Sequence, residues 1–94
     1  MKVFYKRLIA DYVSHRLLTC RKEKILTQKA MAELLLMDVR SYSDLELNKY
    51  CAGKVTFCLF LARFDVDLEQ MKKDIRAILR LVLEDEETEN GLSA

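Results

Sequence analysis

The scarcity of turn-forming residues constrains the fold of this chain more than any other feature. Its 94 residues include no proline and only two glycines, Gly53 and Gly91. Tight β-hairpins need residues that tolerate a positive φ, so such a chain favours helices joined by short polar links. Because 51% of the residues are hydrophobic, one core can still form. We therefore predict a single all-α domain over residues 1–83 and an acidic, disordered tail over residues 84–94.

Residues 27–46 contain two short helical patterns separated by a polar break. Thr27 can cap a first helix with its side-chain oxygen, and Asp38 can cap a second. Apolar residues recur at three- and four-residue steps in the first helix and three apart in the second, at Met31, Ala32, Leu34 and Leu35, then Val39, Tyr42 and Leu45. Each helix can therefore bury one face, and the spacing predicts a helix-turn-helix.

From residue 21 the chain reads RKEKILTQKAMAELLLMDVRSYSDLELNK. The positions that match a known pattern are Leu26, Thr27, Gln28, Met31, Ala32, Leu35, Glu46 and Lys49. On these residues the chain resembles the lambda-repressor-like (Cro/repressor, Xre-type) family of DNA-binding domains, over about half its length, residues 21–71. The resemblance implies a five-helix, all-α helix-turn-helix bundle, here with lengthened first and last helices.

The chain departs from that family at glycines. Ile25, Leu36 and Asn48 stand where glycine is commonest in the resembled pattern. The position of Leu36 often takes a left-handed backbone, which a leucine adopts only at a cost of roughly 1 kcal/mol or more. We therefore expect the turn at Leu36 to be reshaped.

The resemblance implies that the second helix of the pair, residues 38–46, enters the major groove of double-stranded DNA, where base edges can be distinguished. The candidates for base contacts are Val39, Arg40, Ser43 and Asp44. Arg40 could bind guanine through two hydrogen bonds, Asp44 could accept from a cytosine amino group, and Val39 could touch a thymine methyl. The candidates for phosphate contacts are Arg21, Gln28, Lys29, Ser41, Lys49 and Lys54.

The charge distribution gives evidence both for and against DNA. Residues 1–30 carry a balance of +6 and residues 64–94 a balance of −5, and a basic first third suits phosphate binding. Three carboxylates, Asp38, Asp44 and Glu46, would however lie close to phosphates. Glu46 has a structural alternative, bonding a basic residue or the backbone within the domain. A protein-interaction module, such as an inhibitor, antitoxin or adaptor, on the same scaffold is the alternative function.

The apolar spacing in the last third of the sequence predicts two more helices. Thr56 can cap one that ends near Arg63, and its apolar residues are too many for one stripe, which indicates burial on more than one side. Asp67 can cap a last helix of about 16 to 18 residues. Its far end is a candidate dimer or partner face, with packing against the long first helix as the alternative; this face comprises Ile78, Leu79, Leu81, Val82 and Leu83.

No catalytic motif occurs in the sequence, and we expect neither an enzyme nor a cofactor. The three cysteines, Cys20, Cys51 and Cys58, form no Cys-x-x-Cys pair, and the chain has only one histidine, so we expect no zinc site. We expect the thiols to be reduced and mostly buried, with a redox sensor as the alternative. No apolar run reaches the roughly 18 residues of a membrane span. We expect a cytoplasmic, bacterial or phage-like homodimeric regulator whose partner is double-stranded DNA.

Overall fold

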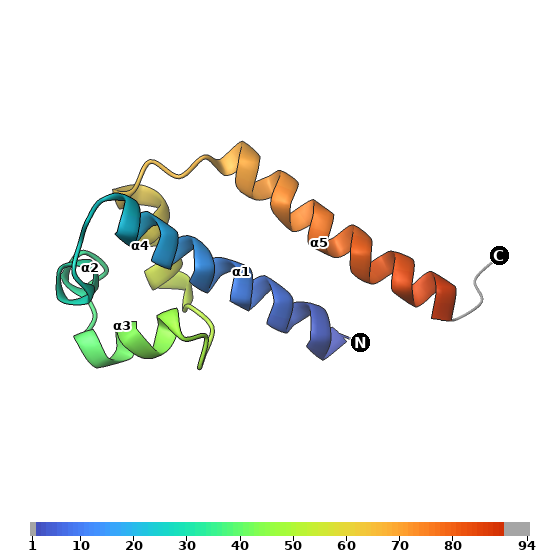
Figure 1. Ribbon diagram of the computed structural model, residues 1–94, viewed down its shortest axis with the longest axis horizontal. Helices are drawn as coiled ribbons and strands as arrows, with labels where there is room; N and C mark the ends of the chain where they lie inside the picture. The colour runs from blue at the N-terminus through green and yellow to red at the C-terminus, as the bar shows by residue number, and fades with distance from the viewer. Residues whose placement is uncertain (1, 90–94) are drawn as a thin grey trace. The chain divides into compact units, whose positions relative to one another are not determined.

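The computed structural model describes the backbone of residues 2–89 and the side chains of residues 4–82. This part of the chain contains five helices and no strand: α1 Lys2–Glu23, α2 Gln28–Leu34, α3 Val39–Glu46, α4 Lys54–Arg63 and α5 Leu68–Glu89 (Figure 1). The all-α prediction is confirmed for these residues. The chain divides into two units, one comprising Ala10–Val66 and the other Met1–Ile9 with Asp67–Ala94.

Three helices begin where the sequence predicts. Thr27, Asp38 and Asp67 precede α2, α3 and α5, and each side chain accepts a 3.0 Å hydrogen bond from the backbone N–H three residues later. Such caps satisfy an amide that has no partner within the helix and typically stabilise it by about 1 kcal/mol. The predicted caps Thr27, Asp38 and Asp67 are therefore confirmed.

Two helix boundaries differ from expectation. The predicted cap at Thr56 is wrong: the fourth helix already begins at Lys54, and Gly53 stands at its cap position without a side-chain hydrogen bond. Helix α5 runs for 22 residues to Glu89, beyond the 16 to 18 expected. Residues 84–89 contain neither glycine nor proline and are mostly glutamate, a good helix former, so nothing local ends the helix earlier. Residues 90–94 of the predicted disordered tail lie outside the described part of the chain.

Three helix ends share one backbone motif. Ile25, Leu36 and Asn48 follow α1, α2 and α3 with φ values of 54°, 55° and 56°. In each case the residue's own N–H donates to the carbonyl three residues earlier, and the next N–H donates to the carbonyl five residues before it, at 3.0–3.1 Å. These paired bonds satisfy the last free carbonyls of a helix. The expected reshaping of the turn at Leu36 is therefore wrong, because this bonding keeps the left-handed backbone.

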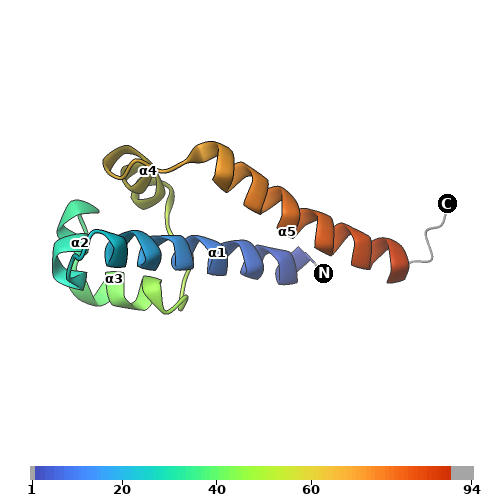
Figure 2. The same cartoon turned by 45° about the horizontal axis from the view of Figure 1, so that its top comes forward.

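The core of the unit Ala10–Val66 combines residues from all four of its helices. Figures 1 and 2 show α2 and α3 beside the C-terminal half of α1. The buried hydrophobic residues of this unit are Leu17, Cys20, Met31, Ala32, Leu35, Tyr42, Leu45, Phe60 and Phe64. Every member of this set from α2 and α3 belongs to the apolar positions that the sequence assigned to those helices. In the other unit, Met71 and Val82 of α5 are buried.

The left-handed positions allow a direct test of stability. Ile25 and Leu36 are 91% and 72% exposed, so the burial of their side chains offsets little of the strain energy of a positive φ. We expect Ile25→Gly and Leu36→Gly each to raise the free energy of unfolding by about 1 kcal/mol in urea denaturation.

Asn48→Gly is the matched control. Asparagine tolerates the left-handed region, and the Asn48 amide group donates to Asp11 Oδ1 at 3.4 Å and accepts from the Ser14 hydroxyl at 3.5 Å. This substitution should therefore give no gain. A loss of stability in Ile25→Gly and Leu36→Gly would contradict the argument from strain.

Candidate nucleic-acid interface

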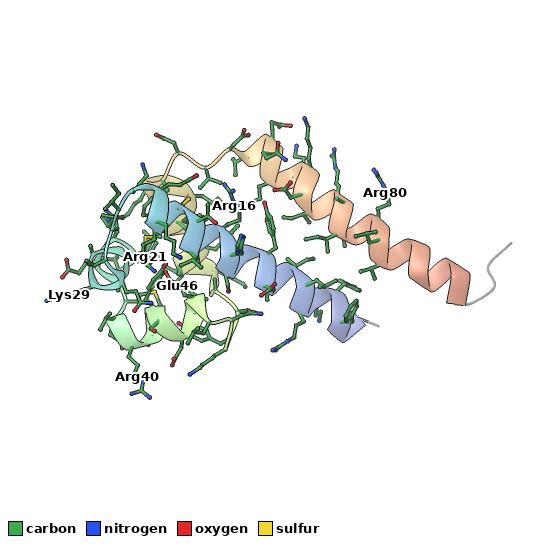
Figure 3. All side chains as sticks on the ribbon, in the orientation of Figure 1. Arg16, Arg21, Lys29, Arg40, Glu46 and Arg80 are labelled. Atoms are coloured by element: carbon green, nitrogen blue, oxygen red, sulfur yellow. The ribbon has the colours of Figure 1, made fainter. Side chains whose placement is uncertain are left out.

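Glu46, the last residue of α3, joins three helices through one buried carboxylate. Its Oε1 accepts hydrogen bonds from Arg21 Nη2 at 3.1 Å and from Gln28 Nε2 at 3.0 Å, and its Oε2 accepts from Arg21 Nε. Arg21 Nη1 also donates to the carbonyl oxygen of Leu26 at 3.0 Å. The side chains of Arg21 and Glu46 are only 16% and 6% exposed, and Figure 3 shows them together between α1 and α3. The structural alternative for Glu46 is therefore the arrangement observed.

The charges in this cluster stabilise one another. Burial raises the pKa of Glu46, but the interactions with Arg21, Tyr42 and Gln28 more than offset this effect and leave the pKa below its usual value. The same carboxylate raises the pKa of Arg21. Beside the pair, burial raises the pKa of Tyr42, whose hydroxyl makes no hydrogen bond of normal geometry to the described residues. At neutral pH the cluster therefore contains one buried ion pair and a neutral phenol.

The other two carboxylates near α3 also have partners within the chain. Asp38 accepts hydrogen bonds from the backbone N–H and the hydroxyl of Ser41, at 3.0 Å and 3.2 Å, and the hydroxyl bond is the larger cause of its lowered pKa. Asp44 Oδ1 lies 3.4 Å from Lys49 Nζ. All three acidic residues that argued against DNA, Asp38, Asp44 and Glu46, are thus hydrogen-bonded or ion-paired internally.

The four base-contact candidates differ in how far they are exposed. Val39 and Arg40 are exposed, whereas Ser43 and Asp44 are half-buried. The Arg40 guanidinium makes no hydrogen bond or ion pair with the described residues, and Figure 3 shows it extending away from α3. Val39 and Arg40 are consequently the members of the set most available to a ligand.

Three of the six phosphate candidates are exposed lysines. Lys29 and Lys54 form no ion pair with the described residues, and Figure 3 shows Lys29 extending away from α2. Lys49 is exposed as well, although its ammonium group is shared with Asp44. These side chains can reach a phosphate without breaking a buried contact.

The other three phosphate candidates are already engaged. Glu46 holds Arg21 and Gln28, and the half-buried Ser41 donates its hydroxyl to Asp38. Using Arg21 for a phosphate would cost a buried ion pair, which is expensive to break. Their observed role is to position α1, α2 and α3.

Tyr50, which is not among the sequence candidates, also positions α3. Its hydroxyl donates to the backbone carbonyl of Ser41 at 2.6 Å, and burial followed by the charges of Asp44 and Asp38 raises its pKa. This bond ties the loop after α3 back to the first turn of the same helix. No periodicity or cap signal in the sequence marks such a contact, because it depends on how the loop folds.

The candidate partner face at the end of α5 is only partly exposed. Ile78 and Leu79 are half-buried, Leu81 is exposed and Val82 is buried. The side chain of Leu83 lies outside the described residues. Leu81, which is 65% exposed, is therefore the most accessible apolar member among those described.

The cysteines were expected to be mostly buried, and this is wrong for two of them. Cys20 is buried, which raises its pKa, but Cys51 and Cys58 are exposed, and all three thiols are free. Among the described side chains no group of three His, Cys, Asp or Glu residues could hold a metal ion.

No helix in the described part of the chain has the length and hydropathy to cross a membrane.

The Glu46 cluster predicts a specific pH dependence of stability. The pKa of Glu46 in the fold lies below 4.5, its value when unperturbed, so its stabilisation is complete above about pH 4.5 and is lost as the pH falls through the folded-state pKa. We expect Glu46→Gln to lower the free energy of unfolding by about 2 kcal/mol at neutral pH and to flatten the acid-side fall in urea titrations.

The exposed Glu33 of α2 supplies the control. Glu33→Gln should change stability by less than about 0.5 kcal/mol and leave the acid-side slope unaltered. Equal pH profiles for Glu46→Gln and the unmodified chain would contradict the assigned role of Glu46.

Comparison with known proteins gives no relative: no protein-family model, no curated protein and no solved structure matches this chain.

Proposed function

We propose that this chain is a sequence-specific DNA-binding regulator that uses α2 and α3 as a helix-turn-helix and reads double-stranded DNA through α3. The observation that carries the proposal is the ion pairing of Glu46 with Arg21 and of Asp44 with Lys49, which leaves Arg40 exposed on α3 without a hydrogen bond or ion pair to a described residue. Two of the three carboxylates that would repel phosphates are thus neutralised by cations of the chain, and the third, Asp38, is held at the N-terminus of α3 by Ser41.

Backbone geometry supports the same proposal. The left-handed residues Ile25, Leu36 and Asn48 occupy the positions where the lambda-repressor-like family, which residues 21–71 resemble, most often has glycine. The turn between α2 and α3 therefore has the backbone conformation that the resemblance implies, although the side chains differ. This agreement favours a helix-turn-helix over an unrelated pairing of two short helices.

The exposed residues divide into two kinds of contact. Arg40 can bind guanine O6 and N7 through two hydrogen bonds, and Val39 beside it can touch a thymine methyl. Lys29 and Lys54 can bind phosphates, which position the protein without reading sequence. The half-buried Asp44 can accept from a cytosine amino group once Lys49 turns to a phosphate.

A homodimer fits this mode of reading. Two copies can place their α3 helices in successive major grooves of a palindromic site, about 34 Å apart. The α5 face around Leu81 is the candidate dimer contact.

Selection from a randomised DNA duplex pool tests the proposal directly. We expect the purified protein to retain a two-fold symmetric motif at low salt and to bind it more weakly as salt rises, because phosphate contacts release counterions. Sequencing the retained duplexes at two salt concentrations is the measurement. No retention at low salt would sink the proposal and favour a protein-interaction module.

Two substitutions distinguish base recognition by Arg40 from phosphate contact by Lys29. Arg40→Ala should relax base preference at one position of the motif, at a cost of about 1 to 3 kcal/mol against the preferred base. Lys29→Ala is the matched control on α2: it should weaken binding to all sequences alike and reduce the salt slope by about one unit. Fluorescence anisotropy on preferred and single-base-changed duplexes measures both effects. An equal loss from Arg40→Ala on every duplex would remove its reading role.

A further inference from the structure

Helix α4 is apolar around its whole circumference. Between Lys54 and Arg63 it carries no charged residue, and Thr56 is the only polar one. A helix of this composition is normally covered on all sides. The sequence accordingly predicts burial on more than one side of α4.

The structure covers only one side of α4. Phe60 is completely buried, and its ring lies 6.5 Å from that of Phe57 and 5.6 Å from that of Phe64. On another side Val55 is 72% exposed, Cys58 and Ala62 are exposed, and Leu59 is half-buried.

The spacing of these four residues, at i, i+3, i+4 and i+7, makes them one continuous strip, which we term the α4 face. Single exposed apolar residues are common on proteins, but a complete helical strip of them is the arrangement that helix-binding surfaces use. Cys58 and Ala62 are small, so another helix can approach closely, while Val55 provides an apolar contact.

Charge identifies the kind of helix that fits. Lys54 and Arg63 border the α4 face and are exposed, and residues 47–64 contain no aspartate or glutamate. Pairing with α4 of a second copy would bring like charges together, because an antiparallel arrangement places Lys54 against Arg63 and a parallel one places each against itself. An acidic helix instead places carboxylates beside both cations, which favours this partner over a second α4.

We propose that the α4 face is a docking surface for an amphipathic helix of another protein, whose apolar stripe is flanked by glutamate or aspartate. The partner's stripe covers Val55, Cys58, Leu59 and Ala62, and its carboxylates pair with Lys54 and Arg63. Lys54 is the one proposed DNA contact that borders this surface; Val55, Cys58, Leu59, Ala62 and Arg63 take no part in the proposed DNA binding, so the α4 face stands whether or not the chain binds DNA.

The experiment uses the full chain and a synthetic helix of about 18 residues with leucine at i, i+3, i+4 and i+7, glutamate directly beside the leucines and alanine elsewhere, since alanine keeps the peptide helical and limits repulsion between glutamates. A matched peptide with lysine in place of glutamate is the control. A fluorophore at the N-terminus of the peptide reports binding by anisotropy and leaves the α4 face unmodified. We expect saturable binding of the acidic peptide alone.

Variants then locate the contact. Val55→Glu and Ala62→Glu should each weaken acidic-peptide binding by at least about tenfold, because each adds a like charge to an apolar contact. Leu47→Glu is the control at an exposed leucine outside α4, and should leave binding unchanged. Circular dichroism melting checks that each variant is folded, and the two substitutions on α4 make the result independent of either one alone.

Other outcomes would overturn the proposal. Equal binding of both peptides, or no saturable binding of the acidic peptide, would remove the charge argument. Self-association in sedimentation that Val55→Glu abolishes would assign the α4 face to a second copy instead. Because none of these measurements contains DNA, their failure is distinguishable from failure of the proposed DNA binding.

Discussion

The buried pair of Arg21 and Glu46 is the interaction on which the arrangement of α1, α2 and α3 depends. One carboxylate receives donors from the end of α1 and, through Gln28, from the start of α2, while it belongs to the end of α3. Removing either charge would leave the other buried without a partner, which costs more than the pair itself contributes. Short helices such as α2 and α3 are not stable alone, so an ionic connection among three helix ends fixes them as a unit.

Much of the fold follows from local signals that a sequence displays directly. The caps Thr27, Asp38 and Asp67 and the apolar spacing of α2 and α3 lie within a few residues of what they determine, and all of these predictions hold. Predictions that depended on tertiary context were less secure. The start of α4 and the exposure of two cysteines depend on which faces the rest of the chain covers, and no local pattern encodes that.

The sequence predicted which residues belong to the candidate site, but not which of them remain available to a ligand and which hold the helices in place. The resemblance grouped Arg21, Gln28 and Lys29 as phosphate contacts, because the corner between the first two helices lies near the DNA backbone in that family. The structure separates them, because Glu46 reaches back over 25 residues to engage Arg21 and over 18 to engage Gln28, while Lys29 remains exposed. Which donors a carboxylate takes is a question of three-dimensional distance, and it decides which cations are left for a ligand.

Helix α3 is tethered at both ends, by Tyr50 to its first turn and by Glu46 and Asn48 at its last. A ligand that binds this helix meets a surface already in its final conformation, so little conformational entropy remains to be lost on association. The heat-capacity change of binding would then reflect surface dehydration alone, without the larger contribution that accompanies the folding of a disordered segment. In calorimetry, α3 would therefore behave as a binding element that is already folded before the ligand arrives.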